Sequence, residues 1–180
     1  MLKTLFKLGL ILFLLCNSAR VVSQELSLID NHLAKLQIQN YSSIEELHEK
    51  ILKTHYSEEQ KVYAIAKFIT NNIAYGTRGI NPLNTINTRQ GVCQDYAELF
   101  IALCKLSNVE NNYVTGNGKT SSEDIGFYSS NHAWNIVKVN EQYQIYDLTW
   151  AAGGYDNEKN TFKKKFNPQY FNADPLSFIS

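Results

Sequence analysis

The stretch RQGVCQDYAELFIALCKL, residues 89–106, places two cysteines on one amphipathic segment. We expect a helix that begins near Cys93, with Tyr96, Phe100 and Ile101 on its packing face. Gly91 lets the chain turn sharply and approach closely just before that helix. The segment therefore raises the question whether Cys93 is a nucleophile, half of a disulfide or a core residue.

A helix over this segment excludes a disulfide between Cys93 and Cys104. An α-helix rises by 1.5 Å per residue, so the two α-carbons would lie ~16 Å apart along the axis. A disulfide needs α-carbons within about 7 Å of each other. Cys104 lies about three turns away on nearly the same face, where we expect a core residue. Cys93 is then a free thiol at the start of a helix.

The position of Cys93 favours the reactive form of its side chain. Cysteine attacks carbonyl carbons as the thiolate, which is the minor form of a free thiol near neutral pH. Unpaired backbone N–H groups at a helix N-terminus stabilise a nearby anion. A nucleophilic cysteine also needs a base, which must come from another part of the chain.

Two strand patterns follow a long polar loop at residues 116–131. The segment HAWNIVKV, residues 132–139, and the segment QYQIYDLTW, residues 142–150, have the composition of strands. Asn140 and Glu141 lie between them as a turn. We therefore expect an antiparallel hairpin.

The register of this hairpin brings a histidine and a carboxylate together. A two-residue turn pairs Val139 with Gln142. Counting outward from this pair places His132 and Asp147 on one face of the sheet as diagonal neighbours, with α-carbons ~7–8 Å apart. A three-residue loop would place them on opposite faces. Taken alone, His132 is also compatible with a strand-end histidine, and Asp147 with a surface aspartate. Together with Cys93 they form a nucleophile, a base and a group that orients the base.

Helix signals precede this region. Ser43 and Ser57 each start a helical pattern, with Glu46 and Gln60 three residues further on, which is the spacing of a capping box. Residues 76–90 are rich in turn residues and are expected to form a loop.

The end of the chain is predicted more coarsely. A polar segment with several lysines follows Gly153 and Gly154, and Asp174 with Pro175 indicates a short capped turn. A further strand is expected at residues 112–116. Helices precede strands along the chain, so the predicted class is α+β with an antiparallel sheet.

These segments resemble a known family. The stretch GVCQDYAELFIALCKLSNVENNYVTG, residues 91–116, followed by NHAWNIVKVNEQYQIYDLTWAAG, residues 131–153, is similar to the transglutaminase-like superfamily of papain-fold thiol enzymes. Position by position, the resemblance implies that Cys93 is the nucleophile, His132 the base and Asp147 the carboxylate. It also implies a papain-like core, in which N-terminal helices and the catalytic helix pack on an antiparallel sheet.

The resemblance implies acyl transfer from an amide of a protein or peptide through a thioester on Cys93. Hydrolysis by water, as in a peptidase or amidase, is favoured over crosslinking to an amine. No calcium-loop pattern is present, so no cofactor is implied. The upstream oxyanion tryptophan of animal transglutaminases has no counterpart; the side chains considered for substrate or oxyanion binding are Gln90, Gln94, Trp134 and Trp150.

Two other classes of protein remain open. The chain is also compatible with a binding or scaffold module that has kept the fold and lost the chemistry. A metal site built from Cys93, His132 and Asp147 has acceptable ligand types. No paired ligand spacing such as C-x-x-C supports that site.

The N-terminus has the three parts of a secretory signal peptide. Lys3 and Lys7 precede a short apolar run, small residues follow it, and cleavage is expected near Ser23 and Gln24. A retained anchor is the alternative; a lipoprotein site at Cys16 is disfavoured because a leucine precedes it. The predicted organisation is a signal peptide at 1–23, a helical lead-in at 24–57 and a core domain at 58–180.

Charge limits the partners. The signal contains three basic residues and no acidic ones, which leaves 14 basic and 17 acidic residues and a charge of −3 in the mature chain. Nucleic acid is therefore not an expected partner. We expect a secreted or periplasmic monomer that acts on a protein or peptide and is not inserted stably in a membrane after the signal is removed.

Overall fold

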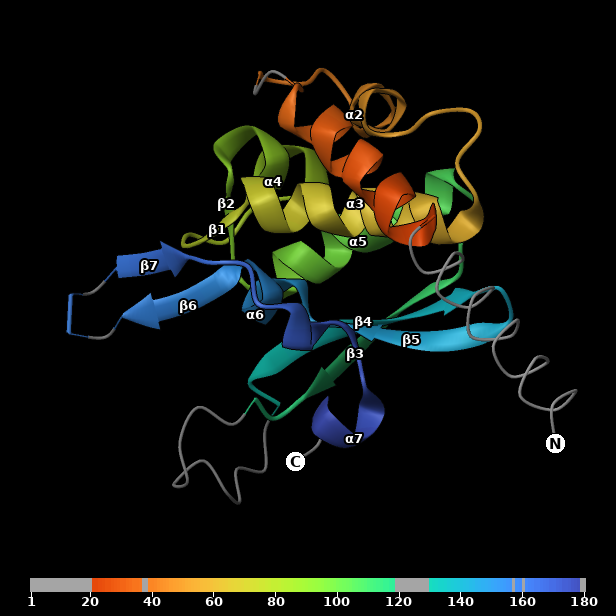
Figure 1. Ribbon diagram of the computed structural model, residues 1–180. Coiled ribbons are helices and arrows are strands. Elements are labelled where there is room, and N and C mark those ends of the chain that lie inside the picture. Colours follow the sequence, from red (N-terminus) through yellow and green to blue (C-terminus); the bar gives the residue numbers. More distant parts are fainter. Residues whose placement is uncertain (1–20, 37–38, 119–129, 157, 160, 179–180) are drawn as a thin grey trace, which may run out of the picture. The chain divides into compact units, whose positions relative to one another are not determined.

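The computed structural model describes residues 21–36, 39–118, 130–156, 158–159 and 161–178 (Figure 1). The chain divides into two compact units, Met1–Leu36 and Gln37–Ser180. In the first unit, residues 21–34 form a helix. Most of the predicted signal peptide lies outside the described residues. Within the described part of the chain, no helix is both long and apolar enough to cross a membrane.

Local caps set the helix starts of the second unit. Ser57 and Gln60 form the complete capping box that the sequence predicts. Ser43 accepts a hydrogen bond from the Glu46 N–H, but the Glu46 carboxylate bonds to Ser42, so the predicted box is only half formed there. Four of the helices are α2 (Ile44–Ile51), α3 (Glu58–Asn72), α4 (Pro82–Thr88) and α5 (Cys93–Leu106).

Helix α4 corrects the prediction of a loop over residues 76–90. Asn81 caps this helix through its side chain, which accepts a hydrogen bond from Asn84 N–H, and Pro82 occupies its first turn. Both are recognised helix-start signals. The helix is short and ends at Arg89, which has a left-handed conformation with φ 57°. Its seven residues are too few for a clear helical periodicity.

The main sheet is antiparallel, as predicted, with the strand order β3-β4-β5-β8. Asn140 and Glu141 have φ values of 48° and 63°, which suit the two-residue turn that joins β4 and β5. Val139 pairs with Gln142, so the predicted register is confirmed. The strands are β3 (Asn111–Gly116), β4 (His132–Val139), β5 (Gln142–Tyr146) and β8 (Phe171–Ala173).

The prediction of a strand over residues 142–150 is wrong in its second half. Strand β5 ends at Tyr146, and the chain turns into helix α6 (Leu148–Ala152). Asp147 lies at this change, where its carboxylate accepts a hydrogen bond from Trp150 N–H at 3.0 Å and caps the new helix. Alternating composition alone does not reveal this cap.

Smaller elements complete the unit. The polar segment after Gly153 forms a β-hairpin that was not predicted, and Asp174 caps the terminal helix as expected, accepting from Ser177 N–H at 3.0 Å. These elements are β1 (Ala74–Tyr75) paired in parallel with β2 (Gln90–Gly91), the hairpin β6 (Gly153–Asp156) and β7 (Thr161–Lys164), the 3₁₀-helix η1 (Pro168–Tyr170) and α7 (Pro175–Phe178).

Helix α5 lies at the centre of the core. Helices α2–α5 are grouped on one side of the sheet formed by β3, β4 and β5, and α5 packs on β3 and β4 (Figure 1). Its Leu99, Phe100, Leu103 and Cys104 are fully buried. Cys104 is therefore a core residue, as expected, and both described cysteines are free thiols.

A buried amide joins α5 to the sheet. The Asn135 side chain on β4 donates to the Ala97 carbonyl of α5 at 3.3 Å and to Asn111 Oδ1 on β3 at 2.8 Å. Asn135 is only 1% exposed. Buried polar groups of this kind are costly when they lose their partner, so the amide specifies how the helix sits on the strands.

We expect Asn135→Ala to lower the free energy of unfolding by about 1–3 kcal/mol, because it leaves Asn111 without its buried partner. Urea denaturation measures the change. Asn112→Ala is the matched control, since Asn112 lies next to Asn111 and is exposed. Equal losses in the two variants would contradict a special role for the buried amide.

Candidate active site

Cys93 is the first residue of α5 and is 8% exposed. Its sulfur accepts hydrogen bonds from the backbone N–H groups of Gln94 and Ala133, and it also interacts with the His132 side chain. One amide comes from the helix start and the other from strand β4. The thiol therefore lies between the N-terminus of α5 and the start of β4.

The surroundings of Cys93 favour its thiolate. Burial opposes the charged form and would raise the pKa. The hydrogen bond and the positive charge of His132, together with the two backbone N–H groups, outweigh burial and lower the pKa of Cys93 below its ordinary value. Cys104 shows the opposite case, because burial raises the pKa of its thiol to about 12.

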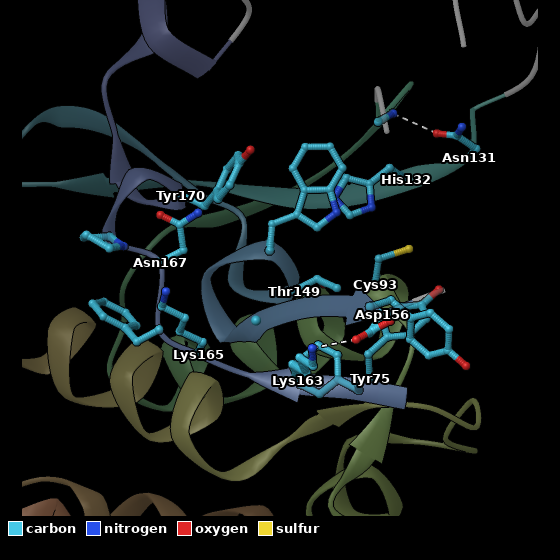
Figure 2. Close-up of a pocket in the computed structure, with 18 residues that line it drawn as sticks. Tyr75, Cys93, Asn131, His132, Thr149, Asp156, Lys163, Lys165, Asn167 and Tyr170 are labelled. Carbon is cyan, nitrogen blue, oxygen red and sulfur yellow. Dashed lines mark hydrogen bonds and ion pairs between the residues drawn. The ribbon is translucent and has the colours of Figure 1, made fainter. Parts of the chain in front are cut away.

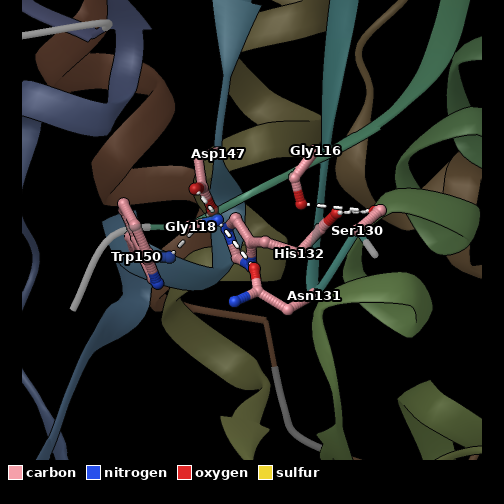
Figure 3. A network of polar contacts seen from close by, with 7 residues as sticks. All are labelled: Gly116, Gly118, Ser130, Asn131, His132, Asp147 and Trp150. Atoms are coloured by element: carbon pink, nitrogen blue, oxygen red, sulfur yellow. Dashed lines mark hydrogen bonds and ion pairs between the residues drawn. The ribbon is translucent and has the colours of Figure 1, made fainter. Parts of the chain in front are cut away.

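His132 opens β4 and lies between the other two side chains. Its Nε2 lies 2.6 Å from Asp147 Oδ2 (Figure 3). Its hydrogen bond with Cys93 completes a chain of three groups. Burial would lower the pKa of His132, but the hydrogen bonds and negative charges of Asp147 and Cys93 raise it to about 9. The imidazolium form is therefore stabilised between a carboxylate and a thiolate.

Asp147 uses its two oxygens for different purposes. Oδ2 receives His132, while Oδ1 accepts the Trp150 N–H. The carboxylate is completely buried, so it needs both partners. The predicted neighbourhood of His132 and Asp147 is correct, but its cause is different: the sheet register ends at Tyr146, and the cap of α6 turns the carboxylate toward the histidine.

Aromatic rings hold the imidazole plane. Trp150 stacks on His132 with ring centroids 4.6 Å apart and planes at 19°, and Trp134 lies 6.0 Å away. Trp150 in turn contacts Tyr170 edge to face. A side chain at Gly118 would meet both Trp150 and His132, so glycine allows the chain to pass closely over the pair.

The two ends of the 116–131 loop are tied together beside His132 (Figure 3). Gly118 N–H donates to Asn131 Oδ1 at 2.7 Å, and the Ser130 hydroxyl donates to the Gly116 carbonyl at 3.2 Å. The centre of this predicted loop, residues 119–129, lies outside the described residues. The closed loop base fixes the start of β4 and hence the backbone of His132.

An open cleft of about 1240 Å³ lies beside Cys93 and His132 (Figure 2). One part of it is formed by the β6–β7 hairpin, where Lys163 pairs with Asp156 at 2.5 Å. Most of the large lining side chains are aromatic. They are Tyr75, Trp150, Tyr155, Phe162, Phe166 and Tyr170.

The cleft tests the other side chains considered from the sequence. Trp150 lines it, whereas Gln90, Gln94 and Trp134 are not among its lining residues. Gln94 contributes its backbone N–H to the thiol. The substrate or oxyanion role considered for the Gln90, Gln94 and Trp134 side chains therefore gains no support from the cleft.

Two contributors were missed at the sequence level. Ala133 offers its backbone N–H to the thiol, and the Asp95 carboxylate accepts the N–H of Val92 at the helix start. An acidic residue in the first turn indicates a helix N-terminus, here one where the N-cap residue Val92 has no side-chain acceptor. A backbone contribution such as that of Ala133 has no signature in the side-chain sequence.

The three central residues do not converge on a metal position. His132 lies between Cys93 and Asp147 and bonds to each of them. In the part of the chain that the structure describes, no group of three or more histidine, cysteine, aspartate or glutamate side chains is arranged to hold an ion. The geometry suits proton transfer along a line of three groups.

A transglutaminase-like superfamily model matches residues 45–148. This match covers more than half of the chain and contains all three central residues. The chain therefore belongs to the transglutaminase-like superfamily, and its α+β architecture with an antiparallel sheet agrees with the predicted class.

Two curated relatives are kyphoscoliosis peptidases from Homo sapiens and Mus musculus, each 28% identical over 154 residues. The alignment covers 79% of this chain but only 23% of each relative, so the chain spans about a quarter of their length.

Similar solved structures include a candidate cysteine protease from Cytophaga hutchinsonii, with 27% identity, a TM-score of 0.48 and coverage of 66% of this chain and 42% of the other. Another is described as a TGase, with 16% identity, a TM-score of 0.49 and coverage of 71% and 35%.

We expect iodoacetamide to alkylate Cys93 rapidly well below pH 8, where an ordinary thiol with a pKa of about 8.5 is mostly protonated. Cys104 is an internal control, because burial keeps it protonated. His132→Ala should remove the fast reaction at low pH. Mass spectrometry of labelled peptides across pH gives both rates. A Cys93 profile like that of a free thiol would contradict the ion pair.

We expect Asp147→Asn to separate the two tasks of this residue. Asparagine still caps α6 through its oxygen. Its amide nitrogen faces His132 Nε2 and favours the tautomer whose proton points at Cys93, so turnover should fall roughly 10²–10⁴-fold. Asp147→Ala loses the cap as well and should cost a further ~1 kcal/mol of stability.

The stability difference between wild type and Asp147→Asn should depend on pH. In the folded wild type the pKa of His132 is raised to about 9, so protonated His132 stabilises the folded state. This contribution is complete below about pH 6.5 and is lost as the pH rises through about 9. Urea denaturation at several pH values measures the difference. A difference that grows toward high pH would contradict the assigned ion pair.

Proposed function

We propose that the chain is a cysteine-dependent hydrolase of amide bonds in proteins or peptides. The observation that carries this proposal is the chain of contacts from Cys93 through His132 to Asp147 beside an open cleft. Cys93 is the proposed nucleophile, His132 the proposed acid and base, and Asp147 the group that orients it. Membership of the superfamily supports the same assignment.

The first half of the proposed reaction forms a thioester. The Cys93 thiolate attacks the carbonyl carbon of the substrate, and a carbon–sulfur bond forms as the carbonyl oxygen gains negative charge. Backbone N–H groups at the start of α5 are the proposed donors to this oxyanion, a contact often worth ~3 kcal/mol. His132 then gives its proton to the leaving amine as the carbon–nitrogen bond breaks.

The second half returns the enzyme to its starting state. His132, now neutral, takes a proton from water, and the hydroxide attacks the thioester carbon. The carbon–sulfur bond breaks, a carboxylic acid leaves and the thiolate is restored beside the imidazolium. Asp147 stabilises the imidazolium in both halves.

Water is the proposed acceptor for the acyl group, in preference to an amine. The cleft is open, so water reaches the carbon atom of a thioester on Cys93. Two relatives that align with most of this chain carry the name peptidase, which supports the same choice. Crosslinking requires that an amine competes with water, which enzymes achieve by excluding water from the site.

The competing acceptors can be distinguished with two peptide substrates. We expect purified protein to cleave an internally quenched peptide, and to release ammonia from a glutamine peptide without incorporating a labelled primary amine. Cys93→Ala should lower the rate by at least roughly 10³-fold, because the nucleophile is lost. Cys104→Ala is the control for removal of a thiol. Efficient amine incorporation by wild type would instead assign a transferase.

A further inference from the structure

Asp95 is a buried carboxylate next to the proposed nucleophile. It is the third residue of α5 and is 2% exposed. One oxygen, Oδ2, accepts two backbone hydrogen bonds: from Val92 N–H at 2.8 Å and from Gly79 N–H at 3.0 Å. Among the described residues no lysine, arginine or histidine forms an ion pair with it. Backbone amides therefore supply its stabilisation.

The two hydrogen bonds join separate parts of the site. Val92 directly precedes Cys93 and caps α5 without a side-chain acceptor of its own. Gly79 belongs to the segment between β1 and α4, which begins just after Tyr75 in the cleft wall. Asp95 Oδ2 thus holds the N-terminus of α5, which carries the Cys93 thiol, against the segment that follows Tyr75.

Close packing leaves little space for side chains at Gly79 and Gly91, beside Asp95. A Cβ at Gly91 would lie 2.7 Å from the Asp95 Cβ, and a Cβ at Gly79 would lie 2.2 Å from the Thr85 hydroxyl oxygen. Neither contact is tolerated by a packed interior. The two glycines allow the backbone to close around the carboxylate.

We infer that Asp95 is a positioning residue that holds Cys93 and the Tyr75 wall of the cleft in one geometry through the acceptor oxygen Oδ2. The inference rests on the proposed thiol chemistry of Cys93. Asp95 acts through the backbone of Val92 and Cys93, which sets the direction of the Gln94 N–H toward the sulfur. Both bonds end on one oxygen, so the acceptor and not the negative charge performs the task.

This distinction gives a sharp pair of variants. In Asp95→Asn one amide oxygen can still accept both N–H groups, whereas Asp95→Ala removes the acceptor. The titratable groups that interact with the Cys93 charge are His132 from β4, Tyr75 from β1 and Tyr113 from β3, and they are unchanged in both variants. Loss of a nearby negative charge can only favour the thiolate.

The experiment measures the pH profile of Cys93 alkylation by iodoacetamide, which needs no substrate, and peptide turnover beside it. Asp95→Asn should keep the wild-type midpoint or lower it. Asp95→Ala should move the midpoint up toward that of a free thiol and reduce turnover about 10- to 100-fold with little change in KM. Glu98→Gln is the matched control, because Glu98 is exposed on the same helix.

The outcomes separate this inference from the proposed function. A wild-type midpoint in Asp95→Ala, or an equal rise in both variants, overturns the positioning role. If Asp95→Ala does not fold, hydrogen exchange of Asp95→Asn decides: protected Val92 and Gly79 amides with a wild-type profile support the role. Unprotected amides with that same profile overturn it. A reactive Cys93 without peptide cleavage would reject the proposed hydrolase alone.

Discussion

The buried hydrogen bond between His132 Nε2 and Asp147 Oδ2, 2.6 Å long, is the interaction on which the site depends. Asp147 is completely buried, and a carboxylate in that position is stable only with charged or N–H partners. His132 provides one and the α6 backbone provides the other. The same bond raises the pKa of His132, and the resulting positive charge lowers the pKa of Cys93. Folding, proton affinity and nucleophilicity are therefore coupled through one pair of atoms.

Helix α5 links this pair to the hydrophobic core. Its first residue carries the thiol, while Leu103 and Cys104 near its other end are fully buried. Asn135 connects the same helix to β3 and β4, one turn beyond the thiol. A rigid helix explains how a side chain at the surface of the core keeps a fixed distance from the histidine on β4. It also explains why two cysteines on one helix have such different proton affinities.

Much of this arrangement could be predicted from sequence, because it depends on local patterns. The start of α5 at Cys93, the register of Val139 with Gln142 and the burial of Cys104 all follow from periodicity and turn composition. The helix at Leu148 could not be predicted in the same way, because Asp147 serves as a cap only when the backbone leaves the sheet there. The Gly79 bond to Asp95 crosses 16 residues and has no local signature.

The three proposed reacting groups share a structural position: each begins an element or caps its start. Cys93 begins α5, His132 begins β4 and Asp147 caps α6. Backbone N–H groups at helix starts have no partner within the helix, so they are free to bind negative charge. Cys93, Asp95 and Asp147 all use such groups. The site can therefore hold a thiolate and a carboxylate on either side of one imidazolium, because backbone N–H groups at helix starts supply additional positive potential.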